Sequence, residues 1–410
     1  MNSKIIKGIY SLIISFAIWP ILDFFISSNI GNFPIIRYSI YGLCSYYIFA
    51  FYNELNKNTN SSNKLYKFLI QFILFVVTIQ FFVNFSEVFD SRQNFLNIKY
   101  CLSGGALLYF SIFILNIQLP LVAFKILLKA SYYLTIVFLV FSLIFFNYFR
   151  TDTLNSAELF VRTFMLGGMY LFLLFPYQKK STNLIVFISF LISLLLMLLN
   201  ARRNVVLYMS SAAFFLGLIL IYSRVHSIRI RRAKLVISSV LIMLFSFIFI
   251  MLNNYSFDRF LKRAETGFDS RTTIIEEFVY DFNKSDLDWL TGRGIFGSFY
   301  SKTNGDKERD GQRNLIENGY LHIILKNGLL YLIPFIIISI IASILGFFYS
   351  KNLLSMASAV LIIVNLIDMV GYGIPFLGLK YLNLLIAFGF CFSQQIRSMS
   401  DSNLRLLLKI

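Results

Sequence analysis

The sequence has little charge, few cysteines and few histidines: 14% of its 410 residues are charged, and it has 3 Cys and 2 His. The cysteines, Cys44, Cys101 and Cys391, fall in apolar stretches and have neither metal-ligand nor disulfide spacing, so we interpret them as packing residues. The alternating apolar pattern of a transmembrane β-barrel is also absent. No small-residue cleavage site follows the first apolar run, Ile5 to Ile26, which favours a retained helix over a signal peptide.

Hydrophobic residues make up 58% of the chain, with 47 Phe, and apolar runs recur along nearly all of it. Runs of about twenty apolar residues can cross a hydrocarbon core about 30 Å thick, and each must form its hydrogen bonds within a helix. The sequence therefore predicts an all-α polytopic membrane protein with about twelve transmembrane helices. They are expected near 5–28, 34–52, 66–86, 99–117, 130–148, 162–177, 183–200, 205–223, 235–252, 328–349, 353–373 and 380–396.

The basic residues indicate the orientation. The segment 224–234 is the most basic connection, so the positive-inside rule puts it in the cytoplasm, and alternation then fixes both termini there. That orientation puts 18 lysines and arginines on the cytoplasmic side, against Glu54 and Asp401 alone. The formal net charge of +17 is therefore a topology signal, and we expect no nucleic-acid partner.

The longest polar stretch is an outer loop over 253–327, which holds twelve acidic and eleven basic residues. It divides the chain into nine expected helices over 1–252, the loop itself, and three expected helices with a cytoplasmic tail over 328–410. We expect short loop helices near 256–265 and 271–283. In the second, Ile274, Ile275, Phe278 and Phe282 are spaced to share one face.

Two groups of charged residues stand out at the outer ends of the spans. Arg202 and Arg203 lie together at a short outer turn, where they oppose the positive-inside bias. Guanidinium groups grip phosphate oxygens, so an anionic ligand explains the pair; lipid headgroups or loop carboxylates are the alternative. Asp23 and Asp368, with Asn365, lie inside expected spans near their outer ends. The carboxylates there either face a polar vestibule or pair with Arg37 or Lys380.

From the seventh expected span onward, the order of motifs resembles the O-antigen polymerase and ligase superfamily of bacterial membrane glycosyltransferases, and with it their GT-C-like architecture. The motifs are Asn200-Ala-Arg-Arg-Asn204 at an outer turn, Ser270-Arg-Thr272 in the loop, Thr291-Gly-Arg-Gly-Ile-Phe-Gly297, and Glu317-Asn-Gly-Tyr-Leu-His-Ile-Ile-Leu-Lys-Asn-Gly328. Ligases of this superfamily have a histidine where this chain has Glu317. That difference favours a polymerase.

The resemblance also implies roles for single residues. Two arginines are expected to bind the diphosphate of an undecaprenyl-diphosphate-linked glycan: Arg203, or Arg202 in the other register, and Arg271. Glu317 is the expected base, and His322 is the alternative. Tyr320 is expected in the catalytic group as well, and further substrate contacts are expected from Asn318, Arg293 and Arg313.

These expectations describe an O-antigen polymerase in the bacterial inner membrane, with its active site in the periplasm and without a metal or cofactor. The segment Asp286-Leu-Asp288 matches a metal-binding pattern of nucleotide-sugar transferases, but a lipid-linked donor carries no nucleotide. The expected partners are lipid-linked donor and acceptor glycans, membrane lipids and a chain-length regulator protein. An O-antigen ligase acting on lipid A core, or a flippase for lipid-linked oligosaccharides, remains the alternative. A flippase would need ionisable residues at mid-membrane and has no use for a long outer loop.

Overall fold

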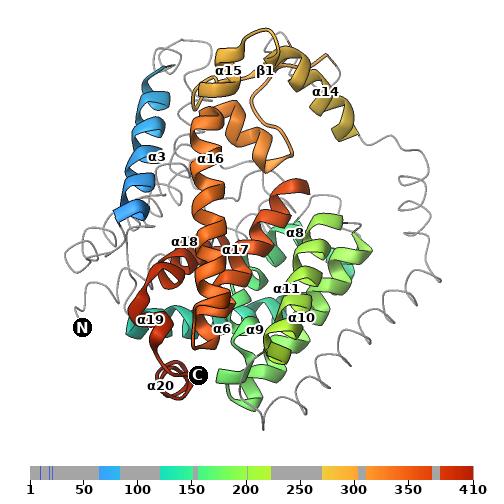
Figure 1. The fold of residues 1–410 in the computed structure, drawn as a ribbon. Coiled ribbons are helices and arrows are strands. Elements are labelled where there is room, and N and C mark those ends of the chain that lie inside the picture. Colours follow the sequence, from blue (N-terminus) through green and yellow to red (C-terminus); the bar gives the residue numbers. More distant parts are fainter. Residues whose placement is uncertain are drawn as a thin grey trace.

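The computed structural model describes residues 64–83, 121–150, 156–200, 202–222, 270–302, 311–371 and 379–409, together with Tyr10, Ile18 and Ile21. These residues are mostly helical, as the all-α prediction requires (Figure 1). Apart from Tyr10, Ile18 and Ile21, the expected spans near 5–28, 34–52, 99–117 and 235–252, and the expected loop helix 256–265, lie outside the described residues. The count of about twelve spans stays a prediction.

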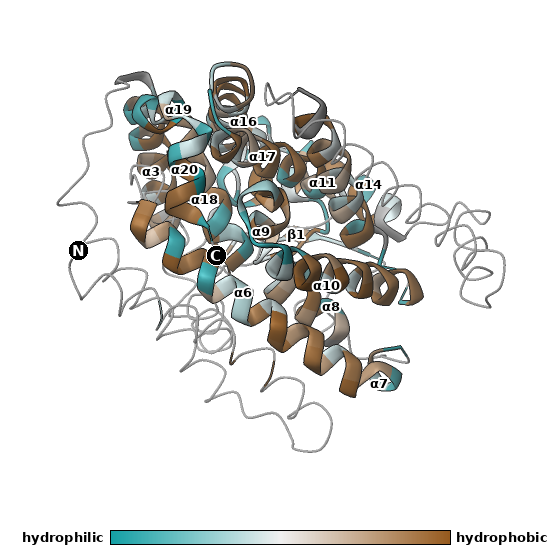
Figure 2. Cartoon of the chain, turned by 90° about the horizontal axis from the view of Figure 1, so that it is seen from below, coloured by the Kyte–Doolittle hydropathy of each residue, from teal (hydrophilic) through white to brown (hydrophobic). Residues whose placement is uncertain are grey.

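Long apolar helices form the body of the molecule. Among the described residues, four helices are long and apolar enough to cross a membrane, and three more hold shorter apolar stretches. The four are α6 (Leu121–Ile144), α10 (Lys180–Leu199), α16 (Gly319–Phe348) and α17 (Leu353–Gly371); the three are α3 (Lys64–Val83), α11 (Arg203–Tyr222) and α18 (Leu379–Phe392). Hydrophobic residues dominate α10, α16 and α17 in Figure 2. This composition indicates a helical membrane protein.

Small residues let α16, α17 and α18 pack closely. A Cβ atom on Gly346 of α16 would lie 2.5 Å from Sγ of Cys391 and 2.8 Å from the Ser355 carbonyl oxygen. In lipid, helices associate through such close packing because no hydrophobic driving force acts between them. Cys391 is fully buried at this contact, which confirms the packing role predicted for it.

The prediction of one continuous span over 162–177 is wrong. The chain there consists of short pieces: α8 (Ser156–Phe160), a π-helical turn (Val161–Met165), α9 (Met169–Leu173) and a 3₁₀ turn (Phe175–Tyr177). The break falls at Gly167 and Gly168, where the Asn383 side chain on α18 donates a hydrogen bond to the Gly167 carbonyl oxygen. A partner from a neighbouring helix thus replaces a bond that the broken helix loses. Apolar composition alone does not reveal such a partner.

A small folded unit caps one end of the helices. This loop unit, residues 270–302 and 311–318, contains α14 (Ser270–Phe282), α15 (Asp286–Thr291) and the antiparallel pair β1 (Phe299–Tyr300) and β2 (Gln312–Arg313) (Figure 1). The ring of Phe278 lies 4.2 Å from Phe282, 5.9 Å from Trp289 and 5.3 Å from Phe299, measured between centroids. The predicted helix 271–283 is confirmed. On its predicted face Ile274, Phe278 and Phe282 are buried, and Ile275 is partly buried against the core.

Two glycines join the loop unit to α16. Gly328 interrupts α16 with a φ of 67°, and a Cβ atom there would lie 2.1 Å from the Leu290 carbonyl oxygen. Gly292 packs against the same kink from α15, also with a positive φ of 74°. Glycine is the residue that adopts this backbone conformation without strain. The glycines at both positions therefore serve packing between the loop unit and the helix.

The C-terminal segment closes the opposite end of the bundle through backbone contacts. It contains α19 (Gln394–Ser398) and α20 (Asp401–Leu408), and a further short helix, α7 (Phe146–Arg150), follows α6. The Asn352 side-chain amide donates to the carbonyl oxygens of Ile396 and Met399, at 2.6 and 3.1 Å. The Asp401 carboxylate accepts from the Leu353 N–H at 2.8 Å and so caps the start of α17.

Candidate functional site

The last turn of α17 is the point where several elements meet. The Asn204 amide near the start of α11 donates to the Gly371 carbonyl oxygen, and the Asn318 amide donates to the neighbouring Val370 carbonyl oxygen at 3.0 Å. The Tyr320 hydroxyl donates to the Leu366 carbonyl oxygen at 2.7 Å. These bonds fix the start of α11 and the start of α16 against the same end of α17.

A pocket of about 210 Å³ opens beside this turn. Its lining is partly aliphatic and partly polar. The aliphatic side consists of Ile274, Ile275, Ile316 and Val370; Thr272, Glu317 and Asn318 are the polar side chains, and Gly371 completes the lining. The Glu317 side chain is exposed to the pocket, which makes its carboxylate reachable by a bound molecule.

One expected catalytic residue lies at the pocket, and two others directly precede residues that lie at or beside it. Glu317 lines the pocket directly. Arg271 is the second residue of α14 and directly precedes Thr272, which lines the pocket. Arg203 is the first residue of α11 and directly precedes Asn204, which is bonded to Gly371. Three segments that lie far apart in the sequence therefore reach one place.

The pocket also collects the starts of three helices. α14 contributes its first turn to the lining, α16 contributes its N-cap residue Asn318, and α11 begins beside Gly371. A helix N-terminus carries roughly half a positive elementary charge and favours anions. The opposite, negative end of α17 is covered by the two asparagine amides on Val370 and Gly371. Backbone dipoles thus favour an anionic ligand here.

Asn318 has a double role at this site. Its side-chain oxygen accepts from the N–H groups of Tyr320 and Leu321, both at 3.1 Å, and so caps α16. Its amide nitrogen holds Val370. The side chain lines the pocket as expected of a substrate contact, and it also holds the helix and the wall together.

His322, the alternative base, lies outside the pocket lining. It is 5% exposed, and its Nδ1 accepts a hydrogen bond from the Ile316 N–H at 3.4 Å. This contact ties the first turn of α16 to the chain that leads into it. Of the two candidate bases, Glu317 is the one that faces the pocket.

The neighbouring arginine, Arg202, has a protein partner. Its Nε lies 3.1 Å from the Glu158 carboxylate, which also accepts from Nε of Arg162 at 2.7 Å. One carboxylate therefore holds two guanidinium groups beside the start of α11. Arg202 therefore pairs with a carboxylate on α8, whereas the alternative offered by the sequence named carboxylates of the loop.

Arg293 cross-links the loop unit. Its guanidinium donates to the carboxylates of Asp281 and Asp288 and to the Ser298 carbonyl oxygen, and it lies 4.5 Å from the centroid of the Phe282 ring. Burial lowers the pKa of Arg293, but the hydrogen bonds to Asp281 and Asp288 outweigh burial and raise the pKa above its ordinary value. It does not line the pocket described above, so its structural contacts account for it.

Arg313 lies on β2, and its Nε donates to the Leu315 carbonyl oxygen at 2.7 Å. It is not among the residues that line the pocket. Asp288, the second carboxylate of the Asp-x-Asp pattern, is bonded to Arg293. In the part of the chain that the structure describes, no three His, Cys, Asp or Glu residues gather as metal ligands.

Sequence reasoning missed the residues that build the pocket wall. Asn204, Thr272 and the pair Val370–Gly371 had no assigned role, although Asn204 and Thr272 each follow an expected arginine. The repeated order of a charged residue followed by asparagine, at 203–204 and 317–318, was the available signal.

The site combines the Glu317 carboxylate, which a bound molecule can contact, with the N-termini of α11, α14 and α16, which carry partial positive charge. A carboxylate can take a proton from a hydroxyl group, and helix N-termini can hold an anionic group beside it. No family model, curated protein or solved structure matches this chain. A functional proposal therefore rests on the arrangement of the site together with the order of motifs in the sequence.

Proposed function

We propose that this protein is an O-antigen polymerase, an inner-membrane glycosyltransferase that joins undecaprenyl-diphosphate-linked repeat units at the periplasmic face. The observation that supports it most is that Asn204 and Asn318 bind consecutive carbonyl groups at the end of α17. These asparagines directly follow Arg203 and Glu317, the diphosphate ligand and the base that the resemblance implies. Glycosyl transfer requires the diphosphate of the donor and the hydroxyl of the acceptor to be bound next to each other, as they would be at this end of α17.

In the proposed reaction, a hydroxyl of the lipid-linked acceptor unit attacks the anomeric carbon of the growing chain. A new carbon–oxygen bond forms while the bond to the diphosphate breaks, and undecaprenyl diphosphate leaves with the bonding electron pair. Glu317 takes the proton of the attacking hydroxyl. Arg203 and Arg271 stabilise the negative charge on the departing diphosphate. Atoms and charges balance with these groups alone.

The charge distribution supports the orientation. With 224–234 in the cytoplasm, the loop unit and the pocket face the periplasm, where lipid-linked units are joined. Both termini then lie in the cytoplasm. The proposal includes membrane lipids and a chain-length regulator as partners.

The test uses purified protein in detergent, a synthetic undecaprenyl-diphosphate-linked repeat unit and no added metal. Lengthened products appear as a ladder on a gel. We expect Arg203→Ala and Arg271→Ala to abolish the ladder, and Glu317→Ala to slow it by about 10²–10⁴-fold, the usual contribution of a general base. Glu276→Ala and Arg405→Ala are matched controls, because both side chains are exposed and lie outside the pocket lining.

Other outcomes identify the alternatives. A ladder that survives Arg203→Ala but not Arg202→Ala would move the diphosphate contact to Arg202. Transfer only when lipid A core is supplied would make the protein a ligase. Neither product, together with movement of labelled lipid across liposomes, would identify a flippase and overturn the glycosyltransferase proposal.

A further inference from the structure

Three polar side chains lie buried together below the pocket. Asn365 and Asp368 are one turn apart on α17, and Lys380 is on α18. Asn365 and Asp368 are 2% and 3% exposed, and the Lys380 side chain is 10% exposed. The other buried residues of α17 are apolar side chains and serines.

The charges in this group are paired. Nζ of Lys380 donates to one carboxylate oxygen of Asp368 and lies 4.2 Å from the centroid of the Tyr208 ring, on α11. This is the pairing with Lys380 that the sequence offered as one alternative. An ammonium group has three N–H donors, so one bond to Asp368 does not use its full capacity.

Three polar atoms of Asn365 and Asp368 have no hydrogen-bond partner among the described residues. Neither the amide nitrogen nor the amide oxygen of Asn365 has a hydrogen bond to any residue that the structure describes, and the same holds for the second carboxylate oxygen, Oδ1, of Asp368. By contrast, Asn204, Asn318 and Asn383 each donate to a backbone carbonyl oxygen of a neighbouring helix or turn. A buried polar group left without a partner costs about 1–3 kcal/mol, and buried polar groups in folded proteins are nearly always satisfied.

The unsatisfied atoms define what can bind. Asn365 Oδ1 and Asp368 Oδ1 accept hydrogen bonds, whereas Asn365 Nδ2 and the remaining N–H groups of Lys380 donate them. A molecule that satisfies both kinds must donate and accept, and it must fit within a closely packed helix contact. Water meets both conditions, and buried waters make about three such bonds.

We propose that Asn365, Asp368 and Lys380 hold bound water between α11, α17 and α18. The water forms the missing hydrogen bonds of the Asn365 and Asp368 side chains, which lie in the last two turns of α17. Those turns carry Leu366, Val370 and Gly371, whose carbonyl oxygens hold Tyr320, Asn318 and Asn204. The hydration site thus supports the wall of the pocket, whichever reaction the pocket performs.

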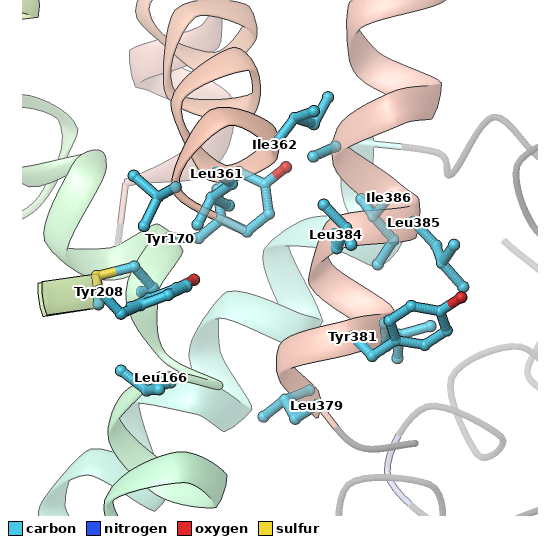
Figure 3. Close-up of a cluster of buried hydrophobic side chains, with 14 of the residues drawn as sticks. Leu166, Tyr170, Tyr208, Leu361, Ile362, Leu379, Tyr381, Leu384, Leu385 and Ile386 are labelled. Atoms are coloured by element: carbon cyan, nitrogen blue, oxygen red, sulfur yellow. The ribbon is translucent and has the colours of Figure 1, made fainter. Parts of the chain in front are cut away.

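X-ray radiolytic footprinting of the full chain in detergent tests the proposal, because a short pulse turns bound water into hydroxyl radicals that oxidise adjacent side chains. Tyr208 lies beside Lys380, whereas Tyr170 bonds to Ser358; both rings are at most 2% exposed and belong to the cluster in Figure 3. We expect Tyr208 to be oxidised several-fold faster than Tyr170. Equal rates in the unaltered protein would overturn the proposal.

Substitution of Asn365 gives an independent measurement. If water is bound, Asn365→Leu displaces it, lowers the oxidation of Tyr208 to that of Tyr170, and lowers the melting temperature by about 2 °C or more. The control is Ser193→Ala, since the Ser193 hydroxyl is fully buried and donates to carbonyl oxygens of its own helix, so its removal displaces no water. A melting temperature that rises in Asn365→Leu would mean a dry amide and contradict the proposal.

Discussion

At the residue scale, asparagine is the side chain that assembles the pocket. Its amide donates and accepts at once, so one residue can cap a helix and bind a carbonyl group of another. Asn318 does both, for α16 and for Val370. Asn204 uses its donor on Gly371. Neither serine nor aspartate, the other common N-cap residues, offers an amide donor.

This reading predicts the effect of removing the Asn318 side chain. Asn318→Ala loses the N-cap, worth about 1 kcal/mol, and the bond to Val370. We therefore expect a lower melting temperature and lower activity. Asn318→Ser should recover most of the stability, because the hydroxyl can still cap α16, while activity stays low. Asn403→Ala, at an exposed position of α20, is the matched control. An Asn318→Ala variant as stable as the unaltered protein would contradict the capping role.

Arg293 shows what residue types alone do not reveal. From the sequence, an arginine in a glycine-rich segment of a polar loop is a reasonable substrate contact. In the structure its guanidinium is bonded to Asp281 and Asp288 and lies over the ring of Phe282. An arginine that stabilises a fold and an arginine that binds an anion can occur in the same sequence context. Only the position of the carboxylates distinguishes them.

At the element scale, the loop unit is small and depends on its ion pairs as well as on its aromatic core. Asp281 is 7% exposed and is the acceptor that connects α14, the segment after α15, and β1. It accepts from Lys284, Arg293 and the Tyr300 N–H. Burial raises the pKa of Asp281, but these hydrogen bonds outweigh burial, so its pKa lies below its ordinary value of 3.8.

A pH dependence follows from this shift. A carboxyl group whose pKa is lower in the folded state stabilises that state fully above the unfolded value of 3.8, and the stabilisation is lost as the pH falls through the lowered pKa. We expect the loop unit to keep its structure at neutral and mildly acidic pH and to loosen only in stronger acid. The loosening of the loop unit is measured by the fluorescence of Trp289, in a Trp19→Phe background that leaves Trp289 as the single tryptophan.

The control for this titration is Asp281→Asn, which cannot lose a proton at this position. It should destabilise the loop unit at neutral pH and remove the part of the acid transition that belongs to Asp281. A transition in the unaltered protein centred well above pH 3.8 would assign the loss to another group.

At the scale of the whole molecule, the distribution of charge and of apolar helices sets the expected orientation. The helices indicate a membrane protein, and the loop unit and the C-terminal helices α19 and α20 lie at opposite ends of the bundle (Figure 1). If the helices between them cross the bilayer, the two ends face different compartments, and the positive-inside rule predicts the C-terminal end in the cytoplasm. The side each end faces remains a prediction.

Cysteine labelling measures that orientation. Tyr280 on α14 is 74% exposed, so Tyr280→Cys in a background without the three native cysteines should react with a membrane-impermeant maleimide added to spheroplasts. Asn403→Cys on α20 should react only after the membrane is opened. The reverse pattern would put the loop unit in the cytoplasm and contradict a periplasmic pocket.

The sequence by itself determined the class of protein, the loop helix over 271–283 and its buried face. Apolar runs and helical spacing are local properties, and the membrane makes helix formation the only way to satisfy the backbone. Only the tertiary structure decided that 162–177 is broken, that Arg202 and Arg293 have carboxylate partners, and that Asn204 and Asn318 meet at the end of α17. Each of these depends on a partner distant in the chain. Composition and spacing do not specify such partners, whereas the packing of helices does.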